Sequence, residues 1–260
     1  MMLDIISPDY ENSDLSFIIV KATAIVLRSP ITTPVQTSFG TMTNRPAVFL
    51  LLVDAQGNTG VGESWCNFSA CGAEHRQRLL GSAILPALLN KEYANPQHCY
   101  HALQAQFKRL AMQAGEQGPI AQCIAAVDIA LWDLVAKRLS LPLHKLLGSE
   151  NATIGVYASG LNPTDGVDNF MRCQDEGFTA FKLKIGFGDE IDYPNIERIC
   201  AKQQPGEQLM VDANPNPLRQ RMYSPNVENG QTTLSDKPGL GVDLDELDTL
   251  QNDPTLLGGQ

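Results

Sequence analysis

The first part of the chain shows the alternation of apolar and polar residues that is typical of β-strands. Apolar and β-branched residues alternate between residues 18 and 28, and residues 47–53 form an apolar run. A turn sequence, Asp-Ala-Gln-Gly-Asn at residues 54–58, leads directly into residues 59–63. Short runs of this kind, bounded by turn residues, predict a three-stranded antiparallel meander.

Helices are predicted next, and they complete a first domain. They cover residues 73–89, 96–112 and 119–139. In the last of them Ile124, Val127 and Leu131 recur at spacings of three and four, which places them on one apolar face. Strands followed by helices indicate an α+β domain, and its expected bounds are residues 18–150. Residues 1–17 are mostly polar and acidic, and they are predicted to form a disordered leader.

Strands and helices alternate beyond residue 150. Strands are predicted at residues 153–158, 180–185 and 208–213, with helices at residues 165–176 and 193–203 between them. Consecutive β-α-β units form parallel sheets, so residues 151–214 are predicted to be part of a TIM-type β/α barrel. A closed barrel takes roughly 200 residues or more, whereas this stretch supplies three strands. Residues 215–260 are rich in Pro, Asn, Gly and Asp and show no such alternation.

Two lysines lie on either side of a leucine in the second of these strands. Because side chains alternate across a strand, Lys182 and Lys184 are expected on one face and Leu183 on the other. Two neighbouring ammonium groups disfavour full protonation of both, so the pKa of one amine can fall far enough for it to act as a base. The alternative is a pair of solvent-exposed lysines on an edge strand.

Asp212 and Asn214 lie at the carboxyl end of the next predicted strand. Active sites of β/α barrels are built at this end of the strands, so Asp212 is expected one strand away from the lysines, at about 5 Å. A carboxylate in this position could hold a hard divalent cation through oxygen. The alternative is that Asp-Ala-Asn forms an ordinary turn or helix cap.

A longer stretch of sequence adds a family resemblance. Residues 125–134 read Ala-Ala-Val-Asp-Ile-Ala-Leu-Trp-Asp-Leu, and residues 141–148 read Leu-Pro-Leu-His-Lys-Leu-Leu-Gly. The chain resembles the mandelate racemase and muconate lactonizing enzyme group of the enolase superfamily. The resemblance rests on these residues, on the Gly-Val-Gly-Glu sequence at 60–63, and on the order Lys-x-Lys, helix, Asp-x-Asn. Residues 32–45 also resemble the substrate-covering loop of that group.

The resemblance implies a capping domain, a β/α barrel and a reaction. The reaction is Mg²⁺-dependent removal of the proton α to the carboxylate of a small substrate such as an acid sugar or a hydroxy acid. By this resemblance Lys184 is the base, Lys182 tunes its pKa, Asp212 is the first metal ligand, and Asn214 supports Asp212. Racemase, acid-sugar dehydratase and cycloisomerase activities all remain open, and a homo-oligomer is possible.

One part of the family pattern is missing. After Asn214 the chain continues with Pro-Asn-Pro-Leu-Arg, which resembles the family sequence after the last barrel strands, and residues 215–260 would then return to the capping domain. Against a barrel of about 250 residues, about 120 are absent, together with two carboxylate ligands and a second acid/base group. Glu228 and Asp236 are poor replacements.

The missing part changes the functional expectation. A single carboxylate cannot offset the cost of dehydrating Mg²⁺, so the metal is expected to be weakly held and the activity impaired. One alternative is a non-catalytic remnant whose capping domain acts as an association module, since three parallel strands would leave an edge unpaired. Another alternative is an artefact of gene modelling.

Charge and composition exclude several classes of protein. A net charge of −10 argues against nucleic acid and anionic lipid as partners. The absence of an apolar run of 18 residues and the acidic first residues argue against a membrane span and a secretory signal, so the cytoplasm is the expected location. The six cysteines form no C-x-x-C pair and are expected to be ordinary buried or half-buried thiols.

Overall fold

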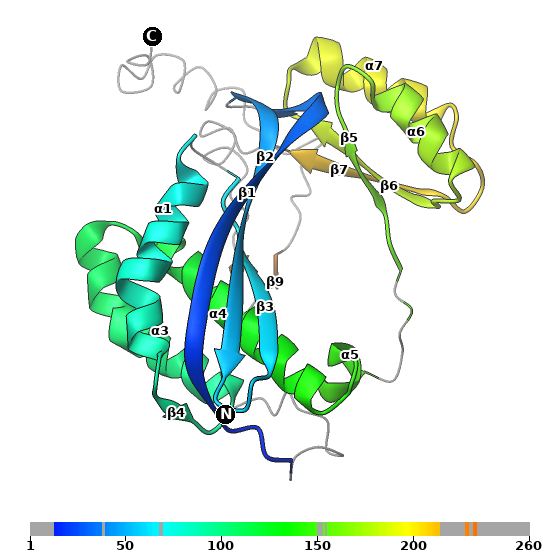
Figure 1. Ribbon diagram of the computed structural model, residues 1–260. Coiled ribbons are helices and arrows are strands. Elements are labelled where there is room, and N and C mark those ends of the chain that lie inside the picture. Colours follow the sequence, from blue (N-terminus) through cyan, green and yellow to red (C-terminus); the bar gives the residue numbers. More distant parts are fainter. Residues whose placement is uncertain are drawn as a thin grey trace. The chain divides into compact units, whose positions relative to one another are not determined.

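The computed structural model divides the chain into two compact units (Figure 1). It describes residues 13–37, 40–67, 70–149, 153, 155–213, 227–228 and 231–232. One unit comprises residues 1–35 and 42–155, and the other comprises residues 36–41 and 156–260. The first corresponds to the predicted α+β capping domain, and the second contains the predicted parallel strands.

A four-stranded sheet forms the centre of the first unit. Its strands are β1 (Phe17–Thr37), β2 (Gly40–Asp54), β3 (Thr59–Ser64) and β4 (Glu92–Tyr93), in the order β3-β2-β1-β4. The pairs β2–β3 and β1–β4 are antiparallel. The three predicted strands are confirmed. The fourth was not predicted, because two residues are too few to show a period.

The helices of this unit cover one face of the sheet (Figure 1). They are α1 (Gly72–Leu79), a π-helical segment η2 (Leu80–Ile84), α2 (Leu85–Leu88), α3 (Pro96–Ala114), α4 (Gln117–Arg138) and α5 (Leu143–Leu146). The side chain of Asn95 caps α3 by accepting a hydrogen bond from the His98 amide at 2.7 Å. At the other end of α3, Gly115 has the left-handed φ of 68° that glycine adopts most easily.

Alternation along β1 and β2 separates a buried face from an exposed one. Val48, Leu50 and Leu52 are buried under the helices, whereas Phe49 and Leu51 point to the opposite face. The same core includes Leu15 and Phe17, which lie inside the predicted leader. The predicted disorder is therefore wrong for these residues, because their burial outweighs the polar character of the segment. Residues 1–12 lie outside the described part.

Helix α4 packs unusually closely on β3. A Cβ added to Gly60 would lie 2.0 Å from the Ala130 carbonyl oxygen, and one added to Gly62 would lie 2.1 Å from that of Ala126. The contact is also polar, because the amide of Val61 donates a 2.8 Å hydrogen bond to Asp133 on α4. Only glycine can occupy both β3 positions at this distance.

The length and apolar composition of α4 would also suit a membrane-crossing helix, but 61% of its most apolar stretch is buried within the protein. Its buried residues include Ile124, Val127, Leu131 and Leu134, the apolar face that the sequence predicted. The described contacts are therefore those of a core helix, packed between β3 and α3.

The second unit contains a three-stranded parallel sheet. Its elements are β5 (Ala158–Leu161), α6 (Gly166–Asp175), β6 (Ala180–Ile185), α7 (Asp189–Cys200) and β7 (Gln208–Ala213), with strand order β5-β6-β7. Both helices lie on one face of the sheet (Figure 1). Its core contains Phe170 and Phe181, whose ring centroids are 4.4 Å apart.

Two predicted boundaries in this unit are wrong. The strand expected at residues 153–158 begins at Ala158, although the apolar residues before it resemble a strand. Helix α7 begins at Asp189 and not near residue 193. Its acidic first turn favours a helix start there, and Pro194 lies inside the helix and not at its first position. Short antiparallel strands β8 (Val227–Glu228) and β9 (Gln231–Thr232) complete the described elements.

We expect Gly62→Ala to lower the free energy of unfolding by about 3 kcal/mol, because the new methyl group would force α4 away from β3. Gly118→Ala is the matched control, since an added Cβ there meets nothing within 4 Å. That control should change stability by no more than about 1 kcal/mol. Urea denaturation of both variants measures the difference, and equal stabilities would contradict the close α4–β3 packing.

Candidate functional site

Strand β6 separates its lysines from the core. Phe181 and Leu183 are fully buried beneath α6 and α7, whereas Lys182 and Lys184 lie on the opposite face and are partly exposed. The predicted alternation is confirmed. Both amines therefore lie on the face of the sheet that these two helices leave open.

Asp212 shares this face with the lysines. The parallel register pairs Lys184 with Asp212 and Lys182 with Met210. The Asp212 carboxylate oxygen lies 3.2 Å from the Lys182 amine. The three side chains that the sequence singled out are thus brought together at the carboxyl ends of β6 and β7. Asn214 lies outside the described residues.

Asp212 has the largest effect on the pKa of Lys182. Asp212 raises the pKa of Lys182 by accepting a hydrogen bond from its ammonium group, and this effect exceeds the opposite effect of desolvation. The lowered pKa that the sequence predicted for one of the two amines was assigned to the base, Lys184, and that assignment stays a prediction.

Tyr157, immediately before β5, also faces Lys182. The Lys182 amine lies 5.3 Å from the centroid of its ring. The register explains the contact, because Ser159 pairs with Lys182 and Tyr157 lies two residues earlier on the same face. Tyr157 lies inside the strand predicted at residues 153–158, but sequence analysis did not single it out as a site residue. Alternation along that strand together with the parallel register would have placed it beside Lys182.

Asp192 organises the chain that leaves β6. Its buried carboxylate accepts a 2.7 Å hydrogen bond from the Gly186 amide and weaker 3.3 Å bonds from the Phe187 amide. Asp192 was not predicted. It lies in the first turn of α7, where a carboxylate is favoured by the helix dipole, and it fixes the loop that follows the lysines.

The described residues do not provide a complete site for Mg²⁺. Asp212 is the one carboxylate that the structure places beside the lysines, and it is already paired with Lys182. Within the described ranges no group of three or more His, Cys, Asp or Glu side chains could hold a metal ion. Mg²⁺ takes six oxygen ligands in a near-octahedral arrangement, so this donor set alone does not fit it.

The cysteines offer no reactive thiol in the core. Cys66, Cys99, Cys123 and Cys173 are buried, as the sequence predicted. Burial raises the pKa of Cys99 to about 12 and that of Cys123 to about 11. These two thiols stay protonated at neutral pH and are poor nucleophiles.

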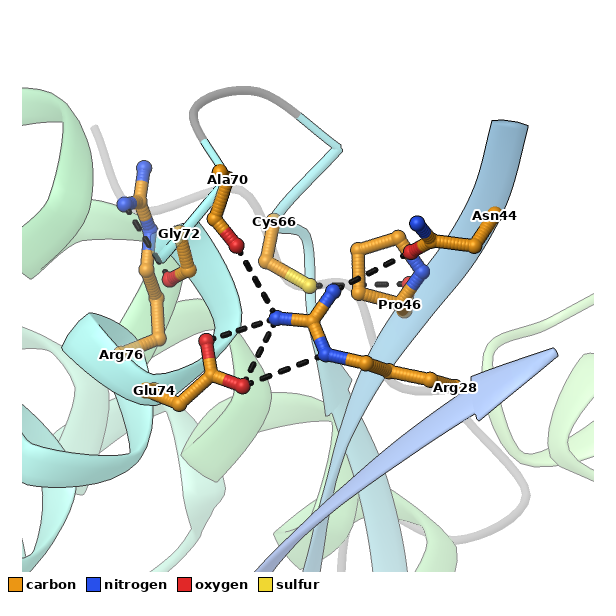
Figure 2. Close-up of polar contacts among 8 residues, drawn as sticks. All are labelled: Arg28, Asn44, Pro46, Cys66, Ala70, Gly72, Glu74 and Arg76. Atoms are coloured by element: carbon orange, nitrogen blue, oxygen red, sulfur yellow. Dashed lines mark hydrogen bonds and ion pairs between the residues drawn. The ribbon is translucent and has the colours of Figure 1, made fainter. Parts of the chain in front are cut away.

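A second polar cluster, in the first unit, connects β1 and β2 with α1 (Figure 2). The Arg28 guanidinium on β1 binds both carboxylate oxygens of Glu74 on α1 at 2.7 Å. It also donates to the side chain of Asn44 on β2 and to the carbonyl of Ala70, each at 3.1 Å. One side chain thereby joins two strands to α1 and to the segment before it.

Comparison with known proteins agrees with this architecture. Residues 21–148 match the N-terminal domain of the mandelate racemase / muconate lactonizing enzyme family. A solved mandelate racemase/muconate lactonizing enzyme from Bordetella bronchiseptica RB50 is 41% identical, with a TM-score of 0.71 over 79% of this chain. The chain belongs to the mandelate racemase and muconate lactonizing enzyme group of the enolase superfamily.

Other known proteins match a similar share of the chain. A racemase from Streptomyces coelicolor A3(2), solved with bound magnesium, is 27% identical with a TM-score of 0.68, and the match covers 76% of this chain and 55% of that one. An o-succinylbenzoate synthase from Geobacillus kaustophilus is 29% identical over 77% of this chain. The chain spans about half the length of these relatives, 54% of the Bordetella protein and 51% of the synthase.

The Arg28 cluster predicts a pH dependence of stability. Arg28 lowers the pKa of Glu74, so the stabilisation is present above the usual pKa of a glutamate, about 4.3, and is lost as the pH falls through the lower value in the folded state. Glu74→Gln should therefore lower the urea midpoint at pH 7 but make little difference at pH 2. A deficit of the same size at both pH values would contradict this assignment.

Proposed function

We propose that this chain carries part of an enzyme that removes the proton α to the carboxylate of a small acid. The observation that supports this proposal is the shared face of Lys182, Lys184 and Asp212 at the carboxyl ends of two neighbouring parallel strands. Barrel enzymes build their sites at this end of the strands. Acid sugars and hydroxy acids are the proposed substrates, and racemisation, dehydration and cycloisomerisation are the proposed reaction types.

The two lysines differ in what they can do. Lys182 is held as a cation by Asp212, so it offers a fixed positive charge to the substrate carboxylate. No hydrogen bond or ion pair engages Lys184 within the part of the chain that the structure describes, so its amine can approach a bound substrate. We therefore assign Lys184 as the base, because a base has to reach the substrate proton and no described partner holds this amine elsewhere.

We further propose that the 260-residue chain alone turns over little or no substrate. Removing an α-proton places a second negative charge on the substrate, and electrostatic stabilisation of such charge is usually the largest catalytic contribution. The family's magnesium would supply that stabilisation, whereas the described residues offer it one carboxylate that is already paired. Asp212 is the proposed first ligand, and Asn214 the residue that supports it.

We expect the 260-residue chain to show little Mg²⁺-dependent α-proton exchange in D₂O, and a version extended by the remaining barrel strands of the family to show it clearly. NMR with a panel of acid sugars and hydroxy acids measures the exchange. In the extended protein, Lys184→Gln should reduce the rate by about 10² to 10⁴-fold, the contribution of a positioned general base. Lys202→Gln, at an exposed position after α7, is the matched control.

Rapid Mg²⁺-dependent exchange by the 260-residue chain would refute its proposed inactivity. Full activity of the Lys184→Gln variant would refute the assignment of the base.

A second candidate function, self-association, is favoured by the open face of the capping sheet. Seven large apolar side chains on this face are each between 36% and 54% exposed. They are Ile18, Val20, Ile25, Leu27, Phe49, Leu51 and Val61. The register brings Leu51 and Val61 side by side on neighbouring strands. This set of residues is called the apolar sheet face below.

We propose a second copy of the chain as the partner for the apolar sheet face. The face gathers seven large apolar side chains that are each at least 36% exposed, and apolar patches on a protein surface are common association sites. The chain carries a net charge of −10, so most surfaces of two copies repel each other, whereas these seven side chains are uncharged. An identical sheet can pack face to face across a two-fold axis.

Leu51→Lys should shift the protein from dimer to monomer in analytical ultracentrifugation, because two-fold packing would bury a lysine from each copy. Met112→Lys, at a 62% exposed position on α3, is the matched control and should leave the dimer intact. A wild-type protein that stays monomeric at high micromolar concentration would rule out self-association through the apolar sheet face.

A further inference from the structure

Lys182 lies between groups from both neighbouring strands. On the side of β7, the Asp212 carboxylate lies 3.2 Å from the lysine amine. On the side of β5, the Tyr157 ring centroid lies 5.3 Å from it, within the ~6 Å range of a cation–π interaction. The amine is therefore approached by a carboxylate from one side and by an aromatic face from the other.

One contact alone would hold this side chain weakly. The Lys182 and Asp212 side chains are 25% and 40% exposed, and a partly exposed ion pair does little to fix a long flexible side chain. The ring of Tyr157 adds a second contact that does not compete for the carboxylate. Two contacts from opposite sides restrict the amine much more than either one does.

We propose that Tyr157 is a positioning residue that keeps the Lys182 amine beside Asp212. The division of roles between the two lysines, with Lys182 as a fixed charge and Lys184 as the base, rests on the proposed function. The position of Lys182 over the ring does not depend on that function and can be tested separately.

The chemistry of the ring explains why an aromatic residue suits this position. A carboxylate in place of Tyr157 would bind Lys182 more strongly, but it would also compete with Asp212 for the ammonium group and repel an acidic substrate. An aromatic ring attracts the cation through its quadrupole and carries no net charge. Lys182 can therefore remain paired with Asp212 while its side chain is held from the side of β5.

NMR of the 260-residue chain labelled with [ε-¹³C]lysine tests the contact. A ring lying under the amine should shift the Lys182 ε-methylene protons upfield of those of Lys184. The shift should persist in Tyr157→Phe, which keeps the ring, and disappear in Tyr157→Leu. Tyr193→Leu removes a 59% exposed tyrosine from α7 and is the matched control, which should leave the Lys182 signal unchanged.

The wild-type spectrum is informative even if a variant fails to fold. A Lys182 signal at the position of a free lysine in the wild-type chain would overturn the proposal, and so would an upfield signal that survives Tyr157→Leu in a folded protein.

Exchange kinetics of the extended protein separate this proposal from the proposed function. There, Tyr157→Leu should slow α-proton exchange by about tenfold to a hundredfold, the typical effect of a misplaced group, and Tyr157→Phe should restore most of the rate. Equal rates for wild type and Tyr157→Leu would overturn the positioning role. If the extended protein shows no exchange at all, the proposed function fails. The upfield shift of the Lys182 ε-methylene protons then still decides whether Tyr157 holds Lys182.

Discussion

The close approach of helix α4 to strand β3 is the constraint on which the first unit depends. Gly60 and Gly62 place no side chain between the strand and the helix, so the backbones meet where any larger residue would collide. The apolar face of α4 then reaches the core, and Asp133 satisfies the Val61 amide. The two most recognisable stretches of the sequence, the Gly-x-Gly-Glu strand and the apolar helix, are therefore the two sides of a single contact.

Regular periodicity explains which parts of the fold could be predicted from the sequence. The bounds of β6 and β7 were predicted correctly, because apolar residues alternate with lysines along β6 and cluster in β7. Strand β4 and the start of β5 were not, because they depend on pairing with distant residues such as Phe17 and Phe181. Local sequence carries no signal for such partners.

The candidate site, like the fold, could be predicted in part from the sequence. Strand alternation and parallel register were enough to place Lys182, Lys184 and Asp212 on one face. The raised pKa of Lys182 was not predictable, because it depends on a hydrogen bond to Asp212 that is set by side-chain conformation. Tyr157 lies within the predicted first strand, but its contact with Lys182 also depends on side-chain conformation and was not predicted.

Substrate binding and turnover make different demands on the sheet face that carries Lys182, Lys184 and Asp212. When all three groups are ionised, two lysines and one aspartate give the face a net charge of +1, which attracts a carboxylate without any metal. Removing a proton from that substrate adds a negative charge, and a single surplus cation cannot stabilise both charges. Under the proposed function, a chain with this face would bind acids without converting them, and the carboxylates that hold a metal are what would separate such a binding protein from the enzyme.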